Sequence, residues 1–229
     1  MALYGRSIWN DFTITLRQGN VVLWLIAINL GIFILQAFIG MIGFLFMADS
    51  AVFETFYQSY FYAPSSLDSL LFRPWTVLTY AFFHADFWHI LFNLLYLYWF
   101  GRIFQVYHSE KRLLNLYLLG ALVGSAFYIV SYNTFPVFEQ AKHQAYLLGA
   151  SGAVWSIIAA AMATNPAYRI RLFIIGSVPL WGIVLFMFGR DLLSFQSNPG
   201  GILAHFGGMI TGFSFCLLYT SDAADEWIG

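Results

Sequence analysis

The stretch YLLGASGAVWSIIAA, residues 146–160, decides how this chain is interpreted. It is apolar enough for a membrane-spanning helix, yet Ser151 lies among small residues where such a helix would carry Leu or Val. One interpretation is helix packing, because small residues let helices approach closely, and Gly152, Ser156 and Ala160 form a ridge at i, i+4 spacing. The other is a nucleophile at a tight turn into a helix, where Gly149 frees the backbone and N–H groups stabilise an oxyanion.

The composition indicates that lipid is the solvent. Of 229 residues, 60% are hydrophobic and only 9% are charged, whereas a soluble domain carries about 25% charged residues. The formal net charge of −1 gives no indication of a nucleic-acid partner. The single cysteine, Cys216, excludes a disulfide within the chain and any CxxC metal site.

Six segments are predicted to span the membrane, since a span needs about 20 mostly apolar residues. Together they predict an all-α membrane protein, a bundle of six transmembrane helices. The segments are 21–47, 87–107, 113–132, 147–165, 172–188 and 202–219.

Basic residues near the span ends predict the orientation. Seven lie in the N-terminal segment and the loops that would share its side: Arg6, Arg17, Arg102, Lys111, Arg112, Arg169 and Arg171. The opposite loops hold three, Arg73, Lys142 and Arg190. This difference predicts a cytoplasmic N-terminus, and six spans return the C-terminus to the same side.

The regions outside the spans differ in character. Residues 1–20 are polar and mixed, do not resemble a cleaved signal, and are expected to be a cytoplasmic segment. The long first loop, 48–85, is rich in aromatics and suits a segment lying partly in the membrane interface. Residues 220–229 form a tail of doubtful origin, because CLLYTSDAADE reads like a translated sequencing adapter. The domain itself is therefore expected to occupy 21–219.

Two further polar clusters lie in predicted spans, where strongly polar groups are costly and indicate function. In AHFGGMITG, His205 lies above Gly208 and Gly212 on one helix face, and the glycines allow a close neighbour. The histidine could be a structural group, an ion or haem ligand, or a general base. In HADFWHILFN, His89 and Asn93 share a helix face, either as packing groups or as donors to an oxyanion.

The predicted topology places these clusters at one depth. Spans two, four and six run in the same direction, and each carries its polar residues in its first turns. His89, Asn93, Ser151 and His205 should therefore lie at a similar level below the outer face. Small ridges on spans four and six should bring Ser151 and His205 within reach of each other.

The sequence resembles the rhomboid family of intramembrane serine proteases. The resemblance covers roughly residues 72–213. It rests on three motifs in order: His89-Ile-Leu-Phe-Asn93, Gly149-Ala150-Ser151-Gly152, and Ala204-His205-Phe206-Gly207-Gly208 with Gly212. One departure concerns the first loop, where many bacterial members carry Trp-Arg and this chain reads Arg73-Pro74-Trp75-Thr76.

The resemblance implies roles for individual residues. Ser151 would be the nucleophile and His205 the base, a dyad without an aspartate and without a cofactor. Asn93, His89 and the backbone at Gly149 and Ser151 would form the oxyanion hole. Gly152, Gly208 and Gly212 would serve helix packing. Span five and the loop 190–201 would form a mobile gate and cap.

The resemblance also implies the setting. The substrates would be single-span or polytopic membrane proteins, cleaved in their transmembrane helices near the extracytoplasmic end. The protein would be a multi-pass protein of the bacterial inner membrane.

Two other functions stay open. A catalytically silent relative, acting as a membrane chaperone or dislocation factor, would keep the fold without the activity. A metal site at His84, His89 and His205, or a transporter, is the third possibility. Because no acidic residue lies deep in a predicted span, an ion-coupled transporter is disfavoured.

Overall fold

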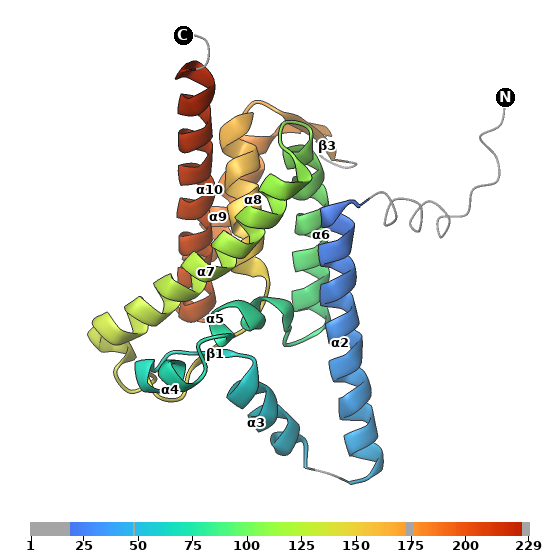
Figure 1. Ribbon diagram of the computed structural model, residues 1–229, viewed down its shortest axis with the longest axis vertical. Coiled ribbons are helices and arrows are strands. Elements are labelled where there is room, and N and C mark those ends of the chain that lie inside the picture. Colours follow the sequence, from blue (N-terminus) through green and yellow to red (C-terminus); the bar gives the residue numbers. More distant parts are fainter. Residues whose placement is uncertain (1–18, 48, 173–175, 226–229) are drawn as a thin grey trace, which may run out of the picture.

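The structure is a computed structural model that describes residues 19–47, 49–172 and 176–225, with side chains described up to 218. Most of the predicted N-terminal segment, and the tail beyond 225, lie outside the described residues. The described part is mostly helical, with two short antiparallel strand pairs (Figure 1). Its helices are α2 (Val21–Leu45), α3 (Ser50–Tyr60), α4 (Leu67–Phe72), α5 (Thr76–Thr79), η1 (Tyr80–Phe82), α6 (Phe87–Gln105), α7 (Glu110–Thr134), η2 (Pro136–Phe138), α8 (Ser151–Thr164), α9 (Leu180–Leu193) and α10 (Pro199–Asp225).

Three helices of the described part are long and apolar enough to cross a membrane: α2, α7 and α10. Helix α8 is apolar and almost wholly buried, but with 14 residues it is too short to be counted among them. The predicted helical membrane protein is thus confirmed, whereas the count of six spans stays a prediction.

The centre of the protein is the contact between α7, α8 and α10, and Figure 1 shows α7 crossing the other two. Glycines make this contact possible. A Cβ on Gly208 would collide with the backbone carbonyl of Gly152, and one on Gly212 would collide with that of Ser156. A Cβ on Gly207 would lie 2.7 Å from the carbonyl oxygen of Val123 in α7. The backbones therefore touch directly, as small residues permit.

The first loop forms a second layer of short helices at one end of the bundle, below α7 in Figure 1. Two side chains fix it, because Arg73 Nη1 donates to the carbonyl of Ser59 at 2.7 Å and Trp75 Nε1 to that of Tyr60 at 2.8 Å. Both acceptors are carbonyls of the last turn of α3, which lack helical partners. The reordered Arg73-Pro74-Trp75 segment thus closes the end of α3.

Two strand pairs complete the fold. In the first, β1 (Ala63–Pro64) pairs antiparallel with β2 (Tyr146–Leu147), so the first loop is joined to the segment before α8. In the second, β3 (Arg169–Leu172) pairs with β4 (Gly176–Pro179).

The structure corrects two predicted span boundaries. The fourth helix begins at Ser151 and not at 147, because 146–147 form β2. The fifth begins at Leu180 and not at 172, because the apolar residues before it form β3 and β4. Pro179 precedes the first helical residue, a position at which its fixed φ suits an extended approach.

The end of the fifth helix carries a buried charge. This helix continues to Leu193, so Asp191 lies inside α9 with 1% of its side chain exposed. Asp191 lies beyond the predicted span 172–188, so the expectation that no acidic residue lies deep in a span stays a prediction.

Candidate active site

A cavity of about 700 Å³ opens between α6, α8, α9 and α10. Four residues singled out in the sequence line it: His89, Asn93, Ser151 and His205. They come from three different helices, at or near the start of each. The structure thus brings together the polar residues that were expected at one depth.

Ser151 owes its position to the turn before it. The chain leaves β2 in an extended conformation, and Gly149 then adopts φ +116°, a value that favours glycine. The N–H of Gly149 donates to the carbonyl of Tyr80 at 3.0 Å, which fixes the turn. Helix α8 begins directly at Ser151, so its hydroxyl lies beside the unpaired N–H groups of a helix start.

The turn also touches α6. A Cβ on Gly149 would lie only 2.6 Å from His89 Nε2, so the glycine allows the imidazole to lie against the backbone. His89 is itself placed by Asp86, whose carboxylate caps α6 and accepts the N–H of His89 at 2.9 Å. The two predicted oxyanion contributors are therefore neighbours.

Asn93 lies one turn further along α6. Its side-chain nitrogen donates to the backbone carbonyl of His89 at 2.9 Å. An amide nitrogen carries two hydrogens, so this bond leaves a second donor. Asn93 is only 6% exposed and lines the cavity, where that donor can serve a ligand.

His84 lies behind the turn, outside the cavity lining. Its Nε2 accepts the N–H of Ala150 at 3.4 Å, which supports the residue just before Ser151. Burial, with a smaller contribution from His89, lowers the pKa of His84 to about 3, so its ring is neutral at physiological pH. Its place is therefore structural support for the turn.

His205 lies in α10 with its ring 5.9 Å from that of Trp155, measured between centroids. Its Nδ1 is 2.6 Å from the Oδ2 of Asp191 in α9. This pair was not predicted, because Arg190-Asp191 follows the predicted fifth span and reads as two charges in a loop. A buried carboxylate thus contacts the histidine of the expected serine–histidine pair, and the pair itself stays a prediction. A span prediction that included 189–193 could have suggested this contact.

The three histidines do not form a metal cluster. Within the described residues, no group of three or more His, Cys, Asp or Glu side chains is arranged to hold a metal ion. His84 and His89 are close, with ring centroids 5.1 Å apart.

Comparison with known proteins identifies related sequences. Residues 72–221 match the Rhomboid domain. The chain is 29% identical to "RHOMBOID-like protein 12, mitochondrial" of Arabidopsis thaliana over 90% of its length, and 26% identical to "Rhomboid-like protease 1" of Toxoplasma gondii over 67%. It is 29% identical to "Rhomboid protein 1, mitochondrial" of Saccharomyces cerevisiae over 58%.

The aligned regions cover 60%, 50% and 38% of these three relatives, so the chain spans about half of their length. None of the three is bacterial. They give no support to the expected bacterial inner membrane, which stays a prediction, whereas an integral membrane protein is confirmed.

Proposed function

The chain belongs to the rhomboid family, and we propose that it is an intramembrane serine endopeptidase that cleaves transmembrane helices of other membrane proteins. One observation carries the proposal. Ser151 and His205, on two helices in direct backbone contact, line the same cavity, together with donors from a third helix.

The chemistry follows from the residue types. The hydroxyl of Ser151 attacks the substrate carbonyl while His205 takes its proton, because serine needs a base to become a nucleophile. The histidine then returns the proton to the leaving amine, since its ordinary pKa lies near neutrality. A water molecule then attacks the acyl-enzyme. His205 takes the proton of the water and returns a proton to the oxygen of Ser151 as the ester bond breaks.

The negative charge of the tetrahedral intermediate needs donors. Asn93, with its second amide hydrogen, and His89 are the side-chain donors, and the N–H of Ser151 is the backbone donor. The expected contribution of Gly149 is corrected, because its N–H is already bonded to the carbonyl of Tyr80. Such preorganised donors are often the largest single contribution to catalysis. Their arrangement on α6 and at the start of α8 suits an oxyanion beside Ser151.

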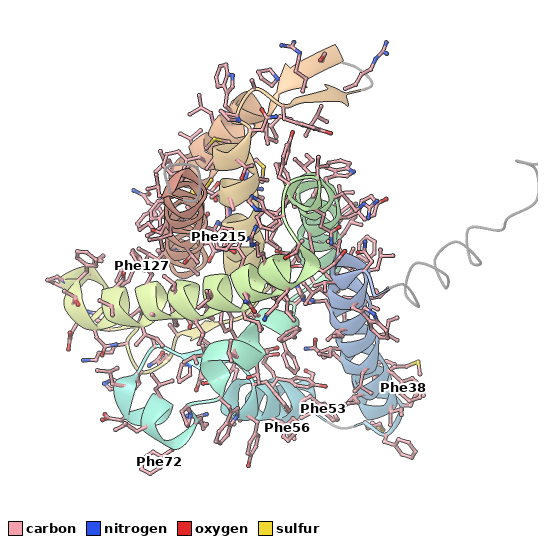
Figure 2. The ribbon with its side chains drawn as sticks, turned by 45° about the horizontal axis from the view of Figure 1, so that its top comes forward. Phe38, Phe53, Phe56, Phe72, Phe127 and Phe215 are labelled. Atoms are coloured by element: carbon pink, nitrogen blue, oxygen red, sulfur yellow. The ribbon has the colours of Figure 1, made fainter. Side chains whose placement is uncertain are left out.

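The proposed setting is a bundle of six spans, α2, α6, α7, α8, α9 and α10, within residues 21–219. The first loop is proposed to lie partly in the outer leaflet, which agrees with exposed aromatics such as Phe72 that point outward (Figure 2). The cavity then opens to the extracytoplasmic side, and substrates enter from the bilayer as single-span or polytopic proteins.

The test is covalent labelling of the detergent-solubilised protein with a fluorophosphonate, followed by peptide mapping. We expect the label on Ser151, and no label on Ser151→Ala. Ser156→Ala is the matched control, because Ser156 lies one turn further along α8 and donates to the carbonyl of Leu116. It should label normally.

Activity is measured in parallel on a model transmembrane substrate. Ser151→Ala and His205→Ala should abolish cleavage while the proteins remain folded, and EDTA or phenanthroline should leave the wild-type rate unchanged. A wild-type protein that neither labels nor cleaves any membrane substrate would favour a silent, chaperone-like relative. Strong inhibition by chelators would favour a metal site.

A further inference from the structure

Asp191 is a buried carboxylate in an apolar helix. Its side chain is 1% exposed, and its two oxygens have different partners. Oδ2 lies 2.6 Å from His205 Nδ1, whereas Oδ1 lies 3.0 Å from Nη2 of Arg190, whose side chain is 62% exposed. A carboxylate in a span is costly and is retained where it is paired or functional. Its buried partner is the histidine that we assign as the base.

We propose that Asp191 is a positioning residue for His205, an inference that rests on the proposed function. An ionised carboxylate can only accept hydrogen bonds, so the 2.6 Å contact places a hydrogen on Nδ1. The neutral ring then carries no hydrogen on Nε2, which is the form that can accept a proton from Ser151. The same carboxylate stabilises the imidazolium that forms after the transfer.

The position of Asp191 also links the base to α9. The buried residues of this helix form one stripe, Leu180, Val184, Met187 and Asp191, at spacings of four, three and four. Asp191 is the last member of the stripe and its only charged one. An outward displacement of α9, the proposed gate, would therefore remove the carboxylate from His205. The base is oriented by the carboxylate only while α9 stays packed against the bundle.

The decisive variant is Asp191→Asn, which keeps the size of the side chain. Its amide can donate to Nδ1, which favours the ring form with hydrogen on Nε2, the form that cannot act as the base. We expect kcat to fall roughly 10²-fold with KM nearly unchanged. The same change costs ~10⁴-fold in a serine-protease triad, and the smaller loss is expected because Trp155 and α10 also hold the ring. Asp191→Glu should recover part of the lost rate.

The second readout does not depend on activity. In protein labelled with ¹⁵N-histidine, the ring nitrogen shifts report which nitrogen carries the hydrogen, and His205→Gln identifies the signal among the five histidines. We expect hydrogen on Nδ1 in the wild type and on Nε2 in Asp191→Asn. Leu192→Asn, which places the same amide at an exposed neighbouring position of α9, is the control and should alter neither readout.

The outcomes separate the possibilities. A wild-type ring with hydrogen on Nε2 overturns the proposal, even if Asp191→Asn does not fold. The proposal is also overturned if Asp191→Asn lowers the stability of the protein but leaves the ring form of His205 and kcat unchanged. Asp191 would then only anchor α9. If Ser151 fails to label while the ring signals change as expected, the proposed function fails and the positioning of His205 by Asp191 stands.

Discussion

Gly149 lies so close to His89 that even one methyl group would not fit between them. A Cβ on Gly149 would be 2.6 Å from His89 Nε2, and the backbone there has φ +116°. Gly149→Ala should therefore displace the imidazole and strain the turn before Ser151 by roughly 1–3 kcal/mol. We expect turnover of a transmembrane substrate to fall by at least 10-fold, measured beside thermal stability.

The control for this variant is Gly176→Ala. Gly176 also has positive φ, +84°, but a Cβ there has no neighbour within 4 Å. It should lose stability through backbone strain alone and keep its turnover. Equal turnover in Gly149→Ala and the wild type would show that the contact with His89 has no catalytic consequence.

The contact between α8 and α10 predicts a stability effect. Gly208→Ala would place a methyl group on the backbone carbonyl of Gly152, which neither helix can avoid by a side-chain rotation. Overpacking of this kind typically costs 1–3 kcal/mol and more where backbone must move. Gly31→Ala, in α2 with open space around it, should instead leave the melting temperature unchanged or higher. Similar melting temperatures for the two variants would contradict the close contact.

Asn93 is expected to contribute to the rate and little to the fold. Removing one donor of an oxyanion hole costs ~10²–10³-fold, and the lower end is expected because His89 and backbone N–H groups remain. Asn93→Ala should reduce kcat while Ser151 still reacts slowly with a fluorophosphonate. Asn93→Asp should be slower still, since a carboxylate repels the developing charge. A large loss of stability with unchanged kcat would make Asn93 a structural amide, bonded to His89 as observed.

Stability should depend on pH through His84. Its pKa is about 3 in the folded protein, against ~6.5 in the unfolded chain. Between these values the unfolded state binds more protons, so stability is full above pH ~6.5 and falls as the pH is lowered toward 3. The melting temperature in detergent should therefore drop between pH 7 and 5, and His84→Gln should flatten that drop.

His108 must be varied in the same experiment. Burial, and secondly Arg112, also lower its pKa, so it adds a dependence of the same sign. His108→Gln separates the two contributions. An undiminished drop in the variant with both substitutions would assign the pH dependence to other groups.

Orientation can be tested with thiol probes, because the only cysteine, Cys216, is buried. Cysteine at Ser197, an exposed position between α9 and α10, should react with an impermeant maleimide added outside the cell membrane. Cysteine at Ala167, exposed after α8, should react only after permeabilisation. The reverse pattern would place the cavity on the opposite side.

The parts of the fold that could be predicted depend on local composition. Apolar runs in the sequence indicate α2, α7 and α10, and the small residues of α8 and α10 indicate that these two helices are in direct contact. Hydropathy alone could not distinguish the β3–β4 pair from a helix, since 172–178 are as apolar as a span. The glycine and proline at 176 and 179 were the only local signs of the turn and of the helix start.

The site was predictable as far as its residues lie in motifs at fixed spacing. Asp191 lies in none. Its partner His205 is 14 residues away on another helix, and the adjacent Arg190 makes the pair look like part of a loop. Its contact with His205 depends on the packing of the helices, because burial and not sequence distinguishes this carboxylate.

Ser65 has a consequence for the order in which the protein is assembled. Its hydroxyl donates to the carbonyls of Lys142 and Ala145, and its own carbonyl accepts the side-chain N–H of Asn133. All three partners are synthesised about 70–80 residues after it, beyond most of α7. The first loop therefore waits for a large part of the chain to leave the ribosome before it can settle beside β2. The turn that presents Ser151 therefore follows a strand whose partner, β1, is held by contacts that cannot form before most of α7 has been made.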